Sequence, residues 1–567
     1  MSNDNSKKII LVAVNAKYIH SNPGAYSLCA FAKRQNPAAD IETLTFTINQ
    51  DPQEIIGEIA AAQPGLIGLS CYIWNIRVIK RIVGTLRKIL PDTQIWLGGP
   101  EVSYCAGEVL AQCEADGIMT GEGELTFAHL VGEYLKGTAG DYRMVKGIVT
   151  RDFDTGEAEL ISLDELPFIY RDFPQDQFEN RILYYESSRG CPYSCTYCLS
   201  SVEKSLRFKS MDKVYEELQF FLDHGVRQVK FVDRTFNSSN SHALSIWRYL
   251  MEHDNGVTNF HFEIAAETIS EEALSLIASM RPGLLRLEIG VQSTCEDTLR
   301  AIKRIMDIEK CKRVAKSILA GGNVRVHLDL IAGLPGESYV RFIQSFNEIY
   351  SLHAHELQLG FLKVLKGTPI SKEADQTGIV YESEPPYEVL FTPDIGYLEL
   401  RKLKAVEEML EIHYNSGQFT RSIAYLEGFF ETPYRLYEAL GDFYKKCGYD
   451  IQQQSRLKRY EILLQFFETL DGNGENKSPG NCNMMKECLL YDLYSRENLK
   501  KRPVFAAEQA EEVRSFYRGN KQLMFDTHIE AVTGPSGERR YLLFDYRMRD
   551  PITGNVKVTD ISDRMGG

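Results

Sequence analysis

Short apolar strands alternate with amphipathic helices in two successive series along the first two thirds of this sequence. The first series predicts strands at residues 9–14, 41–45, 66–71, 94–97 and 117–119. Strands that alternate with helices pair in parallel, because each crossover helix returns the chain to the same edge of the sheet. We therefore predict an α/β chain that begins with a Rossmann-like (flavodoxin-like) parallel sheet in a domain spanning residues 1–139.

The second series predicts strands at residues 183–186, 229–232, 260–265, 285–291, 324–330 and 356–362. Six βα units in about 210 residues are typical of a partial (β/α)6 barrel, whose active-site groups lie at the carboxyl ends of the strands. We expect this barrel to occupy residues 181–384. Residues 140–180, between the two series, indicate a β-hairpin followed by an extended linker.

The pattern changes after residue 385, where long helices are expected at 396–416 and 422–446. A glycine-rich break follows at 471–480, and residues 522–561 are strand-like with a turn at GPSGE. Residues 385–567 are therefore predicted to form a mainly helical region with a β-rich tail.

Length, charge and hydropathy limit the class of protein. A chain of 567 residues exceeds what one hydrophobic core can hold. The net charge of −14 does not support a nucleic-acid-coating surface. No apolar run reaches the length of a membrane span, and the N-terminus lacks a signal-peptide pattern, so we expect a cytoplasmic protein. The 12 cysteines are then interpreted as thiols and metal ligands.

Three cysteines are closely spaced, in SSRGCPYSCTYCLSS, directly after the first barrel strand. Cys191, Cys195 and Cys198 form a CxxxCxxC pattern. Three thiolates can ligate three irons of a 4Fe-4S cluster and leave the fourth iron open. A structural zinc site would need a fourth Cys or His at short spacing, and none follows. The pattern predicts an iron–sulfur cluster with an open coordination position.

This region resembles the radical S-adenosylmethionine (SAM) superfamily, whose cysteine signature has an aromatic residue before the last cysteine, here Tyr197. The resemblance covers residues 182–369. It implies that the open iron binds the methionine amino and carboxylate groups of SAM. It also implies that one electron, from an external donor such as flavodoxin or ferredoxin, breaks the sulfonium bond and gives a 5′-deoxyadenosyl radical.

The same resemblance implies positions for the rest of SAM. In FVDRTFN, Asp233 would accept a hydrogen bond from the methionine amino group of SAM, and in FEIAAET, Glu263 would face the ribose. IGVQS has Gln292 where the family often has Glu. LIAGLPGE resembles the turn that receives adenine, and KGTP at 366–369 resembles the end of the barrel. The implied SAM-binding residues are Tyr197, Asp233, Glu263, Gln292, Ile331 and Leu334.

The N-terminal region, about residues 8–135, resembles the cobalamin-binding domain that precedes one class of radical SAM enzymes. The matching motifs are SCYIWN (70–75), GGPEVS (98–103) and GEGE (121–124), at strand ends. The DxHxxG sequence of many cobalamin proteins is absent, as is common in this class, and His20 is interpreted as a loop residue. The implied cobalamin-binding residues are Ser70, Tyr72, Gly98, Gly99, Pro100, Glu101, Gly121, Glu122 and Gly123.

Two other groups of cysteines could ligate a metal. Cys29, Cys71 and Cys105 are loosely similar to the cysteines that hold a second cluster in methylthiotransferases, but Cys29 falls within an expected helix. We interpret them as buried thiols. Cys482 and Cys488 could bind an auxiliary metal, although no further ligand is close in sequence. Residues after 385 resemble an uncharacterised extension found on some cobalamin-type radical enzymes.

The domain order favours a cobalamin-dependent radical SAM enzyme, most simply a methyltransferase acting at an unactivated centre. The alternatives are a cobalamin-dependent rearrangement or oxidation, a tRNA methylthiotransferase, and a noncatalytic cobalamin or redox sensor. The sequence indicates neither a substrate nor a catalytic residue beyond the cofactor ligands.

Overall fold

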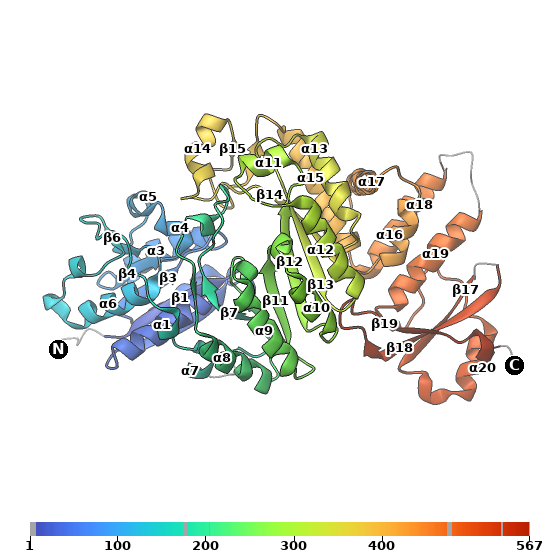
Figure 1. Cartoon of the computed structure of the whole chain (residues 1–567), viewed down its shortest axis with the longest axis horizontal. Helices are drawn as coiled ribbons and strands as arrows, with labels where there is room; N and C mark the ends of the chain where they lie inside the picture. The colour runs from blue at the N-terminus through green and yellow to red at the C-terminus, as the bar shows by residue number, and fades with distance from the viewer. Residues whose placement is uncertain (1–6, 174–177, 203, 473–478, 534–536, 566–567) are drawn as a thin grey trace. The chain divides into compact units, whose positions relative to one another are not determined.

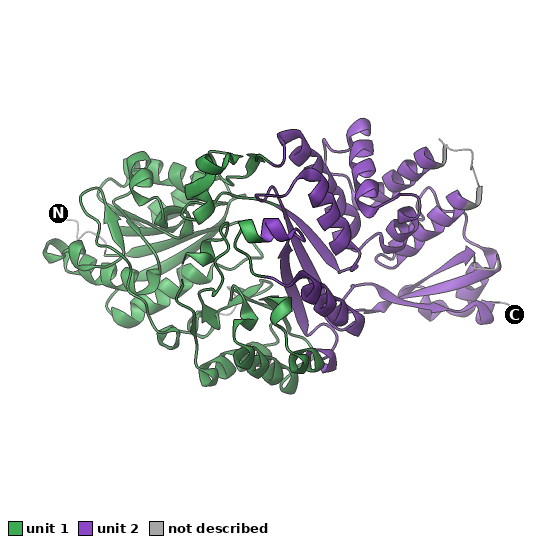
Figure 2. Cartoon of the chain, turned by 45° about the horizontal axis from the view of Figure 1, so that its top comes forward, with its two compact units in different colours: residues 1–276, 300–305, 361–393 green, residues 277–299, 306–360, 394–567 purple. Residues whose placement is uncertain are grey.

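A computed structural model describes residues 7–173, 178–202, 204–472, 479–533 and 537–565 (Figure 1). The chain divides into two compact units (Figure 2). The first comprises Met1–Leu276, Arg300–Ile305 and Phe361–Pro393, and the second comprises Ile277–Leu299, Met306–Gly360 and Asp394–Gly567. Each unit contains part of the second βα series.

The first unit begins with a six-stranded sheet in the order β2-β1-β3-β4-β5-β6. Its five parallel strands confirm the first predicted series: β1 (Ile9–Asn15), β2 (Ile41–Thr47), β3 (Leu66–Ser70), β4 (Gln94–Gly98) and β5 (Gly117–Met119). β6 (Ile148–Thr150) pairs antiparallel with β5. Residues expected to form a separate hairpin therefore add an edge strand to this sheet, and a single bridge joins Val149 to Asp154.

Helices cover both faces of this sheet, which explains why the seven residues of β1 are all apolar or buried. On one face, Ile10 and Val12 pack with α2 (Pro52–Ala61) and α3 (Ile76–Ile89). On the other, Ile9 and Leu11 pack with α1 (Pro23–Gln35) and α6 (Gly123–Leu135). The shorter helices of this region are α4 (Pro100–Ser103), α5 (Ala106–Gln112) and α7 (Ile169–Asp172).

The first unit also holds three strands of the second series. β10 (Gln228–Phe231) pairs in parallel with β7 (Leu183–Tyr185) and with β11 (Asn259–Ile264). Between β7 and β10 lie a two-residue ladder, β8 (Ser188–Arg189) with β9 (Arg207–Phe208), and α8 (Met211–Asp223). The remaining elements are α9 (Asn240–Glu252), α14 (Pro369–Thr377), β15 (Val380–Tyr381) and β16 (Val389–Phe391).

The second unit holds the other three strands, β12 (Leu285–Gln292), β13 (Arg325–Ala332) and β14 (Glu356–Phe361), in the order β14-β13-β12. Buried and partly exposed residues alternate along β12 and β13. Their buried face packs against helices such as α12 (Ile308–Gly321) and α13 (Tyr339–Tyr350), and the other face carries mostly polar residues. Two more helices lie nearby in the sequence, α10 (Glu271–Ser279) and α11 (Glu296–Ala301).

The C-terminal region is helical with a β tail, as predicted. Its helices are α15 (Tyr397–Leu410), α16 (Thr420–Glu427), α17 (Pro433–Cys447), α18 (Arg456–Gly472), α19 (Pro479–Tyr494) and α20 (Glu511–Gly519). The single helix expected at 422–446 is wrong: the chain breaks at Gly428, and Thr432 caps a new helix that starts with Pro433. The expected glycine-rich break falls largely on 473–478, outside the described residues.

The tail forms an antiparallel sheet of β17 (Thr527–Thr533), β18 (Arg539–Arg549) and β19 (Val556–Asp560), as expected. Most of the predicted GPSGE turn, residues 534–536, lies outside the described residues. Within the described ranges, no helix has both the length and the apolar character needed to cross a membrane.

Candidate functional site

The three closely spaced cysteines lie in the loop that follows β8 in the first unit. Cys191 and Cys195 are buried and Cys198 is half-buried, and none forms a disulfide. The loop is anchored through Thr196, whose amide donates to the Ile302 carbonyl at 3.0 Å and whose carbonyl accepts from the Ile370 amide at 3.0 Å. Segments far apart in the sequence thus fix the shape of the cysteine loop.

Two side chains contact the cysteine sulfurs. The Thr235 hydroxyl lies 3.7 Å from Cys191 Sγ, and Arg304 Nη1 lies 3.8 Å from Cys195 Sγ. Burial raises the pKa of the Cys195 thiol, and the Arg304 guanidinium opposes this shift by favouring the thiolate, the form that binds iron. Sequence reasoning missed Arg304, because it is more than 100 residues from Cys195 and lies in no recognised motif.

The cysteine loop fits an iron–sulfur cluster better than a single zinc ion. Ligands of one tetrahedral zinc must gather closely around it, whereas an iron–sulfur cube spreads its thiolates. Among the described residues, the group with ligand atoms within 4.8 Å of one another is Glu288, His327 and Asp329, and the three cysteines are not gathered in this way. Cys191, Cys195 and Cys198 are the residues that would hold the cluster.

Asp233 is completely buried beside this loop. It is the residue predicted to accept a hydrogen bond from the methionine amino group of SAM. Its carboxylate accepts hydrogen bonds from the Ser187 amide at 3.0 Å, the Ser187 hydroxyl at 2.6 Å and the Ser188 hydroxyl at 2.5 Å. Burial raises the pKa of Asp233 to about 6 although these donors lower it. The structure thus shows Asp233 holding the segment before Cys191, and its contact with SAM stays a prediction.

Two other predicted SAM residues lie in the same unit. Glu263 on β11 is one-third exposed, and its Oε1 lies 3.8 Å from Lys230 Nζ. Tyr197 lies between Cys195 and Cys198, and burial raises the pKa of its hydroxyl. Glu263 therefore has access to solvent and Tyr197 lies within the cysteine loop, and the contacts of both residues with SAM stay predictions.

The predicted SAM residues of the second unit differ in exposure. Gln292 ends β12 with a φ of 72°, a region that non-glycine residues rarely adopt. Its buried amide oxygen has no hydrogen-bond partner among the described residues, which leaves it available to a ligand. Ile331 is half-buried, whereas the Leu334 side chain is fully buried in the core.

The polar face of β12 and β13 also carries a cluster that the sequence analysis did not single out. His327 Nε2 lies 3.0 Å from Asp329 Oδ1, and Glu288 on β12 is paired in register with His327 on β13. Glu356 lies beside them, paired with Arg286 at 3.0 Å and with Arg325 at 2.5 Å. Strand alternation predicts which residues share a face, but only the strand register brings these charges together.

The predicted cobalamin residues lie at the carboxyl ends of β3, β4 and β5, three adjacent parallel strands. At such an edge, an open parallel sheet binds its ligands. The Tyr72 and Trp74 rings stack at 4.4 Å, and Trp74 is 42% exposed, so the edge presents a flat apolar surface that suits a macrocycle. Ser70 is held by hydrogen bonds to Val12 and Asn22.

Glycine is required at this edge by the protein itself. Gly99 has a φ of 114°, and a Cβ there would lie 2.6 Å from the Cys71 carbonyl oxygen. Gly99 leads into Pro100 and Glu101, the start of α4, and Gly121 has a φ of 68° before Gly123 begins α6. Gly98 lies against Met119. These positions keep the backbone accessible at the strand ends, which fits the predicted role.

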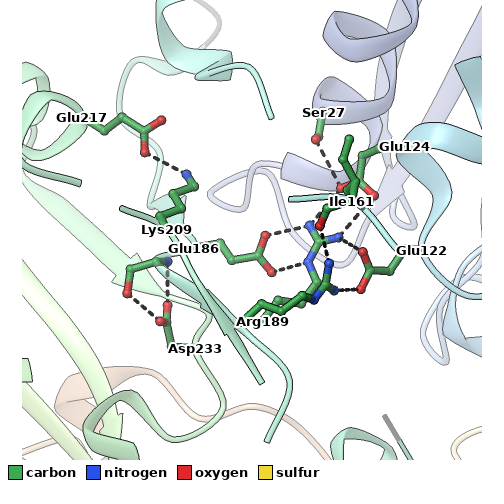
Figure 3. A network of polar contacts seen from close by, with 11 residues as sticks. Ser27, Glu122, Glu124, Ile161, Glu186, Arg189, Lys209, Glu217 and Asp233 are labelled. Carbon is green, nitrogen blue, oxygen red and sulfur yellow. Dashed lines mark hydrogen bonds and ion pairs between the residues drawn. The ribbon is translucent and has the colours of Figure 1, made fainter. Parts of the chain in front are cut away.

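Two predicted cobalamin residues instead bind other side chains. Glu101 is buried and accepts a hydrogen bond from the Tyr387 hydroxyl. Glu122 forms ion pairs with Arg189 at 2.9 Å and with Arg207 (Figure 3). Both carboxylates are thus committed within the protein, and any contact they make with cobalamin is a prediction.

The remaining cysteines and His20 have structural surroundings. Cys29 packs on the opposite face of the sheet from Cys71, so the two cannot ligate one cluster with Cys105. Cys482 and Cys488 lie on α19 and belong to no close group of possible metal ligands within the described part of the chain. His20 hydrogen-bonds through Nδ1 to the Tyr184 hydroxyl at 2.7 Å, as expected of a loop residue.

Three family models match consecutive parts of the chain: a B12 binding domain at residues 9–131, the radical SAM superfamily at 185–349, and a protein of unknown function, DUF4080, at 375–536. A cobalamin-dependent radical SAM methyltransferase, TokK of Streptomyces tokunonensis, is 25% identical over 345 residues, which are 56% of this chain and 50% of TokK. The chain spans about half the length of the curated relatives it matches first.

Solved structures show the same fold. OxsB, a cobalamin-dependent SAM radical enzyme solved with aqua-cobalamin, matches with a TM-score of 0.60 at 17% identity over 86% of this chain and 80% of OxsB. TsrM of Kitasatospora setae, a radical SAM methyltransferase solved with cobalamin and a 4Fe-4S cluster, gives a TM-score of 0.55 at 17% identity over 67% of this chain and 76% of TsrM.

The fold and the cysteine loop therefore define a radical SAM domain, and the radical SAM superfamily implies a 4Fe-4S cluster and SAM. More particularly, a B12-binding domain precedes this radical SAM domain in the chain, and a DUF4080 region follows it. Its architecture, an N-terminal parallel sheet followed by a partial barrel and a helical region with a β tail, is as predicted.

Proposed function

We propose that the protein is a cobalamin-dependent radical SAM methyltransferase acting at an unactivated centre. The observation that carries the proposal is the combination, in one compact unit, of the buried CxxxCxxC loop and the glycine-lined edge of the B12-type sheet. TokK, whose match covers 56% of this chain, is named as a cobalamin-dependent radical SAM methyltransferase. When bound, the cofactors supply an electron, a 5′-deoxyadenosyl radical from SAM and a transferable methyl group.

The chain's own residues would hold and orient these groups. Cys191, Cys195 and Cys198 bind the cluster, and Asp233 fixes the segment that leads to them. The edge formed by the ends of β3, β4 and β5 takes the corrin. An external one-electron donor, such as flavodoxin or ferredoxin, completes the system.

Anaerobic reconstitution with counting of iron and cobalt tests this proposal. We expect about four irons, the content of one 4Fe-4S cluster, and bound cobalamin in each chain. Incubation with SAM and reductant should give 5′-deoxyadenosine, and a methyl acceptor should give S-adenosylhomocysteine as well. Protein that binds no cobalt and has no affinity for added cobalamin would rule out the proposal.

The same experiment separates the alternatives. A radical rearrangement or oxidation would yield 5′-deoxyadenosine without S-adenosylhomocysteine. A tRNA methylthiotransferase would contain about eight irons in two clusters, which the separation of Cys29 from Cys71 on opposite sheet faces disfavours. A noncatalytic sensor would form no 5′-deoxyadenosine, and Cys→Ala variants would leave SAM intact like the unchanged protein.

A further inference from the structure

The segment just before the cluster cysteines, Ser187–Ser188–Arg189, is tied to two parts of the first unit. On one side, Ser187 and Ser188 donate hydrogen bonds to Asp233, after the barrel strand β10. On the other side, Arg189 forms ion pairs with Glu122 and Glu124, at the carboxyl end of β5 in the B12-type domain (Figure 3). Cys191 follows Arg189 by two residues.

Arg189 is the centre of a largely buried network. Its guanidinium contacts Glu122 at 2.9 Å, Glu124 at 2.9 Å and Glu186 at 2.7 Å. Glu122 and Glu124 are each 6% exposed at the side chain. The contacts to Glu124 and Glu186 are bidentate, so the planar guanidinium fixes direction as well as charge.

A second arginine closes the network. Arg207 is the partner of Arg189 across the β8–β9 ladder and also pairs with Glu122, while it donates to the Ile161 carbonyl. Gly190, between Arg189 and Cys191, has a φ of 101°, and a Cβ there would lie 2.4 Å from the Ser205 carbonyl oxygen. Ion pairs, the β8–β9 ladder and the close backbone packing at Gly190 therefore all hold the base of the cysteine loop.

One end of this network lies beside the predicted cobalamin residues, and the other end lies beside the cysteines predicted to bind the cluster. Glu122 is the N-cap residue of α6 and follows Gly121, one of the predicted cobalamin positions, and Glu124 lies in the first turn of α6. Arg189 leads into the cysteine loop. Carboxylates in the first turn of a helix are favoured by its dipole, so the helix also supports this charge. Buried ionic contacts within one compact unit hold two segments at a defined position, because each partner has few alternative arrangements.

We propose that Arg189 is a positioning residue that fixes the cluster loop relative to the cobalamin edge, so that the two cofactors keep a single separation. The proposal rests on the proposed function for the presence of cobalamin. A displacement of about 1 Å between reacting groups can lower a reaction rate about 100-fold. A fixed separation of the two cofactors would therefore maintain the rate of transfer between them.

The test uses the full chain loaded anaerobically with cluster and cobalamin. Reduced cluster and cob(II)alamin are both paramagnetic, so pulsed electron paramagnetic resonance measures their magnetic interaction and hence their separation. Arg189→Lys keeps the charge but loses the bidentate fork. We expect R189K to retain iron and cobalt, while its distribution of separations becomes at least about twofold wider, because a flexible lysine ammonium can meet the carboxylates in several arrangements.

Glu124→Gln is the milder second variant, because it leaves the Arg189 contacts to Glu122 and Glu186 in place. It should widen the distribution in the same direction and decides the question alone if R189K fails to fold. Arg171→Lys is the matched control, since its ion pair with Glu216 at 2.8 Å is exposed. An unchanged distribution in R189K and E124Q, or equal widening in R171K, overturns the proposal.

Hydrogen exchange gives a reading that does not need cobalamin. In cluster-loaded R189K, amides at 120–124 and at 187–190 should both exchange about tenfold faster, because one charged contact holds both segments. Faster exchange in only one segment, or in neither, would show that Arg189 does not hold the two segments together. If the unchanged protein binds no cobalt, the proposed function fails, and the exchange result still decides whether Arg189 joins the two loops.

Discussion

At the scale of single residues, Asp233 shows how a buried carboxylate can organise a loop. Its oxygens accept hydrogen bonds from a backbone amide and from two serine hydroxyls, all in the segment before Cys191. The Ser187 hydroxyl also lies 3.0 Å from His242 Nε2, so the network continues into α9. A buried donor that loses its acceptor pays the full cost of desolvation.

Asp233→Asn should therefore destabilise the cysteine loop, because an amide NH2 would face hydroxyl donors. We expect a loss of about 1–3 kcal/mol in the free energy of unfolding and a lower iron content after reconstitution. Asp223→Asn, at an exposed position on α8, is the control and should change stability by less than about 0.5 kcal/mol. Equal stability and iron content in the two variants would contradict this role.

His327 makes part of the stability depend on pH. Burial alone lowers the pKa of His327, but the hydrogen bond to Asp329 and the charges of Asp329, Glu288 and Glu356 raise it above its usual value. The folded protein thus holds this proton more tightly than the unfolded chain. The contribution is complete below the ordinary histidine pKa of about 6.5 and is lost as pH rises through the higher folded value.

We expect native-state hydrogen exchange of β13 to report this loss as faster opening when pH is raised from about 6 to about 8, after correction for intrinsic exchange rates. His327→Gln should flatten the dependence. His224→Gln is the control, because this histidine is exposed on the other unit. A slope that persists in H327Q would show that another group is responsible.

At the scale of elements, the turn after β4 depends on one glycine. Gly99 combines a φ of 114° with a backbone oxygen 2.6 Å from the position of a Cβ, so both conformation and space exclude a side chain. The amide of Cys71 donates to the Gly98 carbonyl at 2.7 Å across the same strand ends. This close approach of β3 and β4 forms the middle of the proposed cobalamin edge.

Gly99→Ala should destabilise this edge by about 1–3 kcal/mol through backbone strain. Exchange of the β3 and β4 amides measures the loss, and cobalamin affinity should fall with it. Gly57→Ala is the matched control: Gly57 lies within α2 with nothing within 4 Å of a Cβ, so alanine should stabilise the protein by about 0.5–1 kcal/mol. Stability that is the same in G99A and the unchanged protein would refute the strain argument.

At the scale of the whole molecule, the DUF4080 region shares a core with the second half of the barrel series. Tyr339 and Tyr350 of α13 hydrogen-bond to Tyr434 and Tyr437 of α17 at 2.8 and 3.0 Å. Phe346 packs edge-on against Tyr434 in the same interface. The second compact unit therefore needs chain from both regions.

A chain that ends at Pro393 should accordingly be insoluble or aggregated, since it exposes Phe346 and Tyr350, which are at most 1% exposed in the full chain. Size-exclusion chromatography and limited proteolysis measure this outcome. Tyr437→Phe in the full chain is the control, because it removes one hydroxyl and leaves the packing, and it should remain monodisperse. A soluble, protease-resistant fragment of residues 1–393 would show that the DUF4080 region is a separable domain.

The sequence by itself determined the strands of the two βα series and the close spacing of the three cysteines that are predicted to bind the cluster. Apolar runs of strand length and helical periodicity depend on local residues, so the eleven strands β1–β5, β7 and β10–β14 and the spacing of Cys191, Cys195 and Cys198 could be read directly. Helix boundaries could not be read in the same way. The apolar pattern continues through residues 422–446, but Gly428 and Pro433 have low helix propensity and divide this segment into two helices.

Only the tertiary structure decided which distant side chains meet. The contact of Arg304 with Cys195, the burial of Asp233 against Ser187 and Ser188, and the ion pairs of Glu122 with Arg189 and Arg207 join residues that no local pattern connects. Glu122 could thus be expected to face cobalamin, although its carboxylate is bound by two arginines. Charges are paired by sheet order and loop closure, and these depend on packing of the whole unit rather than on neighbouring residues.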